Sequence, residues 1–122
     1  MSSSKPLAGL RVLIVEDEYL IAYQLAGAME ELGAEVADMA GSLQDAMEAA
    51  DRPIDGALVD VHLNGEMSFP LIDKLNDSGV PFILMTGYDP SALPAPLISH
   101  PRVTKPFEPS QLQKIVRATF VR

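Results

Sequence analysis

The chain of 122 residues contains no cysteine, which excludes disulfide bonds, thiolate metal sites and cysteine nucleophiles. It also lacks an apolar segment that approaches the roughly 18 residues needed to cross a bilayer. The opening residues, Met-Ser-Ser-Ser-Lys-Pro, lack the apolar stretch of a secretory signal. We therefore expect a cytoplasmic protein that has no membrane segment.

Basic residues are scarce, with 9 Lys and Arg against 17 Asp and Glu, and the formal net charge is −8. A DNA-binding domain needs a basic face that displaces counterions from the phosphate backbone, so direct nucleic-acid binding is not expected. Neither of the common Gly-rich nucleotide loops is present. The partners of this chain are therefore expected to be proteins.

The length and composition fit one globular domain. Hydrophobic residues make up 48% of the chain and charged residues 21%, and 122 residues can bury a real core but cannot form two domains. We expect residues 1–8 to be a disordered tail and residues 9–122 to be the domain.

Four strand-like runs end abruptly in polar residues, which is typical of buried strands that open onto a site. The polar residues that follow these runs, in chain order, are Glu16 and Asp17, Asp60, Thr86 and Lys105. If the strands are parallel neighbours, these side chains converge at one rim of the sheet. They are three carboxylates, a hydroxyl and an amine.

Helical patterns alternate with the strands. Apolar residues recur at helical spacing over residues 18–32, and further helices are expected after Ser42, after Ser68 and after Glu108. Residues 87–101 contain four prolines, each of which costs roughly 3 kcal/mol inside a helix. We therefore expect the fourth helix to be short or broken.

This alternation predicts an α/β fold, a doubly wound parallel sheet of five strands covered by helices on both faces. Ligands bind such sheets beyond the carboxyl ends of the strands, where the strand order reverses. We apply the order 2-1-3-4-5, known for sheets of this kind, rather than derive it from the sequence. In that order the strands that carry the polar residues are consecutive neighbours.

Three carboxylates in one pocket repel by about 4 kcal/mol per pair at roughly 4 Å, with an effective dielectric constant near 20. A hard divalent cation offsets this repulsion, and Mg²⁺ fits best because it accepts carboxylates and keeps positions open for phosphate oxygens. A carboxylate flanked by a metal, an ammonium group and a hydroxyl can attack a phosphoryl group and form an acyl phosphate. The pocket is therefore interpreted as a phosphoacceptor site.

From residue 10 to residue 122 the chain resembles the flavodoxin-like receiver domain of bacterial two-component response regulators. The resemblance implies that Asp60 is the phosphorylated aspartate and that Glu16 and Asp17 are the acidic metal ligands. It also implies that the backbone carbonyl of His62 is a further Mg²⁺ ligand, beside the Asp60 carboxylate.

The resemblance further implies that Thr86 and Lys105 hold the phosphoryl group. Two features depart from the family pattern. Arg102 stands where the family has an aromatic switch residue, and the segment of the fourth helix is rich in proline. Residues 81–88 resemble instead the Thr-Gly-Tyr signature of a subgroup of alphaproteobacterial single-domain receivers, several of which act in stress-response phosphorelays. We identify Tyr88 as the switch candidate.

The expected function is that of a single-domain response regulator, which is not an enzyme acting on a separate substrate. It would accept a phosphoryl group from a histidine kinase or a histidine phosphotransfer protein, and it would signal as a monomer or weak dimer through protein contacts. One alternative is a phosphorylation-independent adaptor, although an adaptor needs none of the site residues. Another is an aspartyl-phosphate phosphatase, a class that usually has a second acid where this chain has His62.

Overall fold

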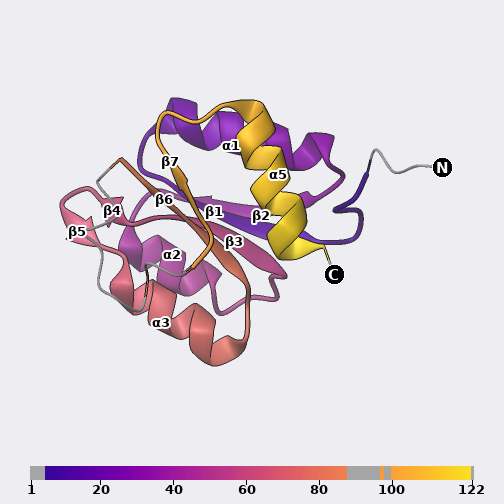
Figure 1. The fold of residues 1–122 in the computed structure, drawn as a ribbon. Coiled ribbons are helices and arrows are strands. Elements are labelled where there is room, and N and C mark those ends of the chain that lie inside the picture. Colours follow the sequence, from indigo (N-terminus) through magenta and orange to yellow (C-terminus); the bar gives the residue numbers. More distant parts are fainter. Residues whose placement is uncertain (1–4, 88–96, 98–99, 122) are drawn as a thin grey trace.

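The computed structural model describes residues 5–87, 97 and 100–121. Its described part is a central parallel sheet between two layers of helices (Figure 1). The elements are β1 Arg11–Val15, α1 Tyr19–Glu31, β2 Glu35–Ala40, α2 Leu43–Ala49, β3 Gly56–Asp60, β4 His62–Leu63, β5 Glu66–Met67, α3 Phe69–Ser78, β6 Phe82–Thr86, β7 Arg102–Thr104 and α5 Pro109–Phe120.

The strand order in the sheet is β2-β1-β3-β6-β7, and every pair of neighbours is parallel. This order is the predicted 2-1-3-4-5, because β6 and β7 are the fourth and fifth strands of the main sheet. The doubly wound α/β fold is thereby confirmed.

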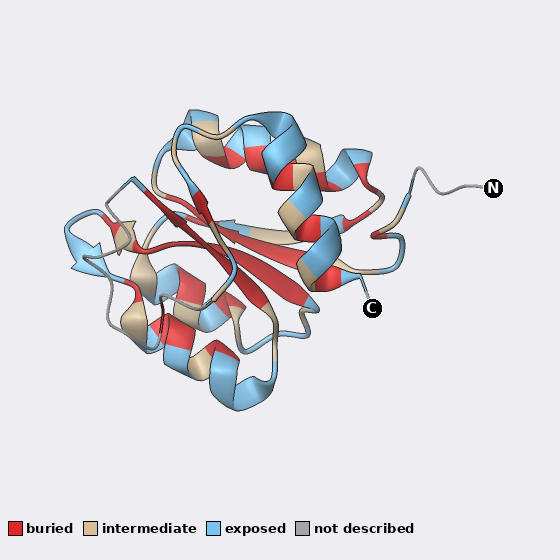
Figure 2. Ribbon diagram, in the orientation of Figure 1, coloured by how far each residue is buried: buried red, intermediate tan, exposed pale blue. Residues whose placement is uncertain are grey.

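Helices α1 and α5 cover one face of the sheet, and α2 and α3 cover the other (Figure 1). Each face of the sheet has its own hydrophobic core, and alternate residues of β1 point into one or the other. Val12 and Ile14 pack toward α1 and α5. Leu13 and Val15 pack toward α2 and α3. Strands β3 and β6 are buried along their whole length (Figure 2). A strand that is buried on both faces has no polar alternation, which is why these two appear in the sequence as unbroken apolar runs.

Local capping signals set the helix ends. The Ser42 side chain accepts a hydrogen bond of 3.1 Å from the backbone N–H of Asp45 at the start of α2. Gly79 ends α3 in the left-handed conformation, with φ of 73°. Pro109 occupies the first turn of α5, where its missing N–H costs nothing. The starts of α2 and α5 were predicted from the sequence.

The predicted disordered tail is wrong for residues 5–8. Leu7 is completely buried in the core beside α1, and its backbone N–H donates a hydrogen bond of 2.9 Å to the carbonyl of Leu32. A single apolar side chain in a polar stretch has no periodicity, so the sequence pattern did not reveal that it closes the end of this core.

A second, two-stranded sheet follows β3 and was not predicted. Strands β4 and β5 are antiparallel, and a two-residue turn joins them. Asn64 and Gly65 form that turn with positive φ angles of 46° and 85°, the conformation of a type I′ hairpin turn. The Asn-Gly dipeptide is the sequence signal that predicts such a turn.

The predicted short or broken fourth helix falls largely outside the described residues, and so does Tyr88. Among the residues that the structure describes, no helix is long and apolar enough to cross a membrane.

Candidate functional site

The register of the sheet brings the predicted acids to one rim. Val15 of β1 pairs with Val59 of β3, so the next residues, Glu16 and Asp60, end neighbouring strands at the same level. Asp17 follows directly, and carboxylate oxygens of all three acids lie within 4.8 Å of one another. The convergence that parallel strands predict is therefore present at the carboxyl end of the sheet.

The same register brings the hydroxyl and the amine to this rim from the other side. Thr86 pairs with Thr104 at the end of β7, and the backbone N–H of Lys105 donates a hydrogen bond of 2.9 Å to the carbonyl of Thr86. Thr86 is buried, with 1% of its surface exposed. The Lys105–Pro106 peptide bond, which follows at once, is cis.

Lys105 forms ion pairs with two of the three acids. Its Nζ lies 2.8 Å from Oδ2 of Asp60 and 2.7 Å from Oε1 of Glu16. Partial burial lowers the pKa of Lys105, but its hydrogen bond to Asp60 and its close contact with the Glu16 carboxylate outweigh this effect and hold the pKa above its ordinary value. Lys105 is therefore a firmly charged counter-ion for both acids.

Glu16 is the most deeply buried of the three acids. Its Oε2 accepts a hydrogen bond of 3.0 Å from the N–H of Glu18, whereas Oε1 has only the ion pair with Lys105, without hydrogen-bond geometry. Burial raises the pKa of Glu16 to about 7, although the ammonium group and the Glu18 N–H oppose the shift. Glu16 thus gains a proton readily in the metal-free site.

Asp17 behaves in the opposite way. Its Oδ2 accepts a hydrogen bond of 2.9 Å from the backbone N–H of Asn64, at the tip of the β4–β5 hairpin. Burial raises the pKa of Asp17, but hydrogen bonds from Asn64 and with Glu16 outweigh it and hold the pKa below the ordinary value. The fold therefore stabilises the ionised form of Asp17.

Asp60 lies at the centre of the group, with 6% of its surface exposed. Its Oδ1 accepts a hydrogen bond of 3.1 Å from the N–H of His62, and its Oδ2 accepts the one from Lys105. The carboxylate opens onto a pocket of about 350 Å³. The residues that line this pocket are Asp17, Glu18, Asp60, His62, Gly87 and Lys105.

The donor set at this rim fits Mg²⁺. The three carboxylates and one ammonium group leave a formal charge of −2 when all are ionised, which is the charge that one divalent cation neutralises. Every side-chain atom that could bind the ion is a carboxylate oxygen, and oxygen is the ligand atom that Mg²⁺ prefers. The buried Glu16 Oε1, which lacks a hydrogen-bond donor of suitable geometry, adds to this fit.

His62 is half-buried in β4, beside Asp60. In an antiparallel pair the N–H and C=O of one residue point to the same side, so the His62 carbonyl shares the edge from which its N–H reaches Asp60. Arg102, which departs from the family pattern, lies in β7, and His100 lies just before that strand. Arg102 is half-buried in that edge strand, and the ring of His100 stacks on Phe82 with 4.8 Å between ring centroids.

Sequence reasoning missed two residues that hold the site together. Asn64 contacts Asp17, as described, and its side-chain Nδ2 donates a hydrogen bond of 3.3 Å to the carbonyl of Gly41. The buried Ser68 hydroxyl donates to the carbonyl of Asp60 at 2.8 Å. The Asn-Gly turn signal could have pointed to Asn64, whereas Ser68 was interpreted only as the start of a helix.

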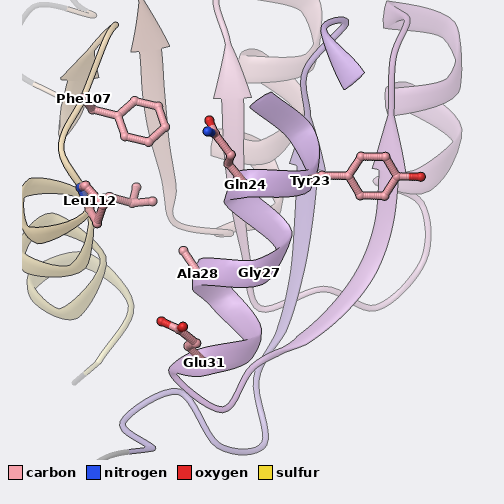
Figure 3. A pocket seen from close by; sticks show the side chains of 8 residues that line it. Tyr23, Gln24, Gly27, Ala28, Glu31, Phe107 and Leu112 are labelled. Carbon is pink, nitrogen blue, oxygen red and sulfur yellow. The ribbon is translucent and has the colours of Figure 1, made fainter. Parts of the chain in front are cut away.

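A separate cavity of about 450 Å³ lies between α1 and α5, away from the acidic group (Figure 3). Phe107 and Leu112 face α1 across it, and Gly27 and Ala28 form part of the opposite wall. Its lining is mainly apolar, and only one carboxylate, that of Glu31, borders it.

Comparison with known proteins links this geometry to a family. SdrG from Sphingomonas melonis Fr1 is 32% identical over 97% of this chain and 98% of its own, with a TM-score of 0.79. The PhyR response regulator receiver (REC) domain from Erythrobacter litoralis is 32% identical over 91% of this chain and 89% of its own, with a TM-score of 0.80. This chain belongs to the response regulator receiver family.

The receiver domain also occurs within longer proteins of the family. PhyR from Brucella abortus is 28% identical over 96% of this chain, with a TM-score of 0.79, and this receiver spans 49% of that protein's length. No family model matches the sequence, and no curated protein matches it. The family assignment therefore rests on the similarity to solved receiver structures.

Proposed function

We propose that this receiver accepts a phosphoryl group on Asp60 from the phosphohistidine of a kinase or phosphotransfer protein. One observation carries the proposal: the Asp60 carboxylate faces an open pocket, contacts Lys105 at 2.8 Å and lies beside Glu16 and Asp17. Of the three acids, Asp60 is the one that both forms an ion pair with Lys105 and lines that pocket. Asp17 and Lys105 line the pocket beside it.

In the proposed step, a carboxylate oxygen of Asp60 forms a bond to phosphorus, and the bond between phosphorus and the imidazole nitrogen of the donor breaks. The electron pair of that bond stays on the imidazole nitrogen, which takes up a proton from solvent. Lys105 is placed to bind an equatorial phosphoryl oxygen, and we assign the Thr86 hydroxyl to a second one. The product is an acyl phosphate on Asp60.

We assign Mg²⁺ binding to Glu16, Asp17, Asp60 and the backbone carbonyl of His62. When bound, Mg²⁺ supplies positive charge that neutralises phosphoryl oxygens during transfer. The three carboxylates would hold the ion, and Lys105 adds a second positive charge beside Asp60. An incoming phosphoryl group would then meet the charges of both the ion and the ammonium group.

We propose that the phosphorylated receiver signals through protein contacts in the cytoplasm, as a monomer or weak dimer, and is not an enzyme acting on a separate substrate. The relatives support this reading. PhyR from Bartonella quintana is described as an anti-anti-sigma factor, so a receiver of this kind occurs in a protein that acts on other proteins.

Incubation with acetyl phosphate and Mg²⁺, followed by intact-mass measurement, tests the proposal. Here the bond between phosphorus and the acetyl oxygen breaks, and acetate leaves. We expect one phosphoryl adduct on the native protein and none on Asp60→Asn. Asp73→Asn removes an exposed acid of α3 and serves as the matched control, which should label as the native protein does. Full labelling of Asp60→Asn would contradict the assignment.

A further inference from the structure

Two backbone N–H groups of the β4–β5 hairpin, one in β4 and one in its turn, contact the two acids that flank the pocket. The N–H of His62 donates to Oδ1 of Asp60 at 3.1 Å, and the N–H of Asn64 donates to Oδ2 of Asp17 at 2.9 Å. The two donors are two residues apart in the chain. Their acceptors come from the ends of different strands of the main sheet.

The hairpin geometry explains why both donors point the same way. Leu63 pairs with Glu66 of β5 across the two-residue turn, so its N–H and C=O face the partner strand. The N–H groups of the residues on either side of Leu63 face away from β5. The outer edge of the hairpin thus presents two donors, the N–H of His62 in β4 and the N–H of Asn64 in the turn.

Three further contacts hold this edge in place. The Asn64 side chain donates to the carbonyl of Gly41, in the loop between β2 and α2, and the Leu63 side chain is completely buried. At the base of the hairpin, the hydroxyl of Ser68 donates to the carbonyl of Asp60. The hairpin is therefore fixed at its tip, its middle and its base.

The backbone of Asn64 has the conformation that its turn requires. It is the single non-glycine residue with positive φ among the residues that the structure describes. The first position of a type I′ turn needs a positive φ, which asparagine adopts more readily than most residues with a Cβ. Glycine would adopt this conformation at lower cost but would lack the amide that reaches Gly41.

We propose that the outer edge of the β4–β5 hairpin is a backbone template that sets the separation of Asp17 and Asp60, and that Asn64 is the positioning residue that locks this template against the β2–α2 loop. The inference rests on the proposed function, because it assigns Asp17 to the cation that assists phosphorylation. Asn64 touches neither the cation nor the phosphoryl group. It acts through the orientation of Asp17.

Asn64→Gly tests the proposal with little disturbance, because glycine accepts the positive φ and keeps the backbone N–H. Only the side-chain hydrogen bond to Gly41 is lost. The Mg²⁺ dissociation constant, measured by titration calorimetry with Mg²⁺ alone, should rise about three- to tenfold, the worth of one hydrogen bond. Asp17→Ala provides the reference for loss of a ligand and should weaken binding further.

Gly79→Ala is the matched control. Gly79 has a φ of 73° and an added Cβ would meet no atom within 4 Å, so alanine destabilises the protein by backbone strain at the far end of α3. Its Mg²⁺ affinity should equal that of the native protein. If Gly79→Ala weakened Mg²⁺ binding as much as Asn64→Gly does, the effect would come from general destabilisation, and the positioning role would be wrong.

Labelling with acetyl phosphate separates this inference from the proposed function. In Asn64→Gly the Mg²⁺ concentration for half-maximal labelling should rise by the same factor as the dissociation constant, with the deficit removed at saturating Mg²⁺. Absence of an adduct on the native protein would refute the proposed function and leave the calorimetric comparison intact. A Mg²⁺ affinity in Asn64→Gly that is unchanged or tighter overturns the positioning role.

Amide hydrogen exchange provides a second readout that needs neither Mg²⁺ nor phosphate. In Asp17→Ala the Asn64 amide loses its acceptor, so it should exchange faster than in the native protein, while the His62 amide keeps its acceptor on Asp60. Equal acceleration of both amides would show that the hairpin loosens as a whole. Unchanged exchange at Asn64 would show that the contact with Asp17 does not hold the template.

Discussion

Lys105 and Asp60 are joined by a hydrogen bond of 2.8 Å that crosses the rim of the sheet from the end of β7 to the end of β3. The same ammonium group also lies 2.7 Å from Glu16. One cation therefore balances two acids in the metal-free protein. A phosphoryl group on Asp60 would bring new oxygens within reach of this cation, so the ion pairs of the resting site become the phosphoryl-binding contacts.

Lys105→Met should destabilise the metal-free protein. The substitution keeps the length of the side chain and leaves the carboxylates of Glu16 and Asp60 without their cation, which should cost about 1 to 3 kcal/mol of unfolding free energy. Urea unfolding measures the change. Lys74→Met is the control, because Lys74 pairs with Asp51, whose side chain is 69% exposed, and exposed pairs contribute less than about 1 kcal/mol. Equal losses in the two variants would contradict this ranking.

The stability of the metal-free protein should fall as pH rises from about 4.5 to about 7. Glu16 has a folded-state pKa of about 7 against an ordinary value of 4.5, so in this range the folded protein holds a proton that the unfolded chain has lost. Stability is then highest below the unfolded pKa and declines through the folded pKa, by up to about 3 kcal/mol.

Glu16→Gln is the control for this pH dependence, because glutamine does not titrate and every other titrating group remains. The unfolding free energy of this variant, followed by urea unfolding in a metal chelator, should vary less over the same range than that of the native protein. Parallel pH profiles for the two proteins would show that Glu16 is not the group responsible.

Strand ends explain why so much of the site could be predicted. Strands β3 and β6 lie at the centre of the sheet and are buried on both faces, so they produce apolar runs with clear ends. In a parallel sheet all carboxyl ends meet at one rim, which places Asp60 and Lys105 together although 45 positions separate them in the chain. The resemblance to receivers supplied the strand order and the roles.

The hairpin could not be predicted in the same way. Strands of two residues are too short to show a period, and the contact between Asn64 and Asp17 joins residues 47 positions apart without a shared strand pairing. Sequence reasoning predicted repulsion among the acids, offset by a divalent cation and an ammonium group, but not the individual surroundings of each acid. The structure shows a hydrogen-bond donor that lowers the pKa of Asp17 and a burial that raises the pKa of Glu16 despite its Lys105 counter-ion.

Gly27→Ala should stabilise the protein. Gly27 lies inside α1 and is exposed, and an added Cβ would meet no atom within 4 Å. Alanine is favoured over glycine in a helix interior by about 1 kcal/mol, which corresponds to a rise of roughly 4 °C in melting temperature for a domain of this size. Gly79→Ala should shift the melting temperature downward because of its positive φ. A lower melting temperature for Gly27→Ala would show that a Cβ at this position disturbs the packing around the cavity between α1 and α5.

Ser68→Ala should weaken both the fold and the proposed chemistry. The Ser68 hydroxyl is completely buried and lies within hydrogen-bond distance of two carbonyls, 2.8 Å from that of Asp60 and 3.1 Å from that of Val61. Alanine removes this donor and leaves the carbonyl of Asp60 without it, at a cost of about 1 to 3 kcal/mol of unfolding free energy. The backbone that carries the proposed phosphoacceptor then loses one of its restraints.

The kinetic consequence separates Ser68 from Asn64. Because Ser68 restrains the residue that is proposed to attack phosphorus, Ser68→Ala should slow the labelling of Asp60 by acetyl phosphate even at saturating Mg²⁺, whereas excess Mg²⁺ should rescue Asn64→Gly. Ser78→Ala, at the exposed end of α3, is the control and should change stability by less than about 0.5 kcal/mol. Rescue of Ser68→Ala by Mg²⁺ would place its effect on the metal ligands rather than on the backbone of Asp60.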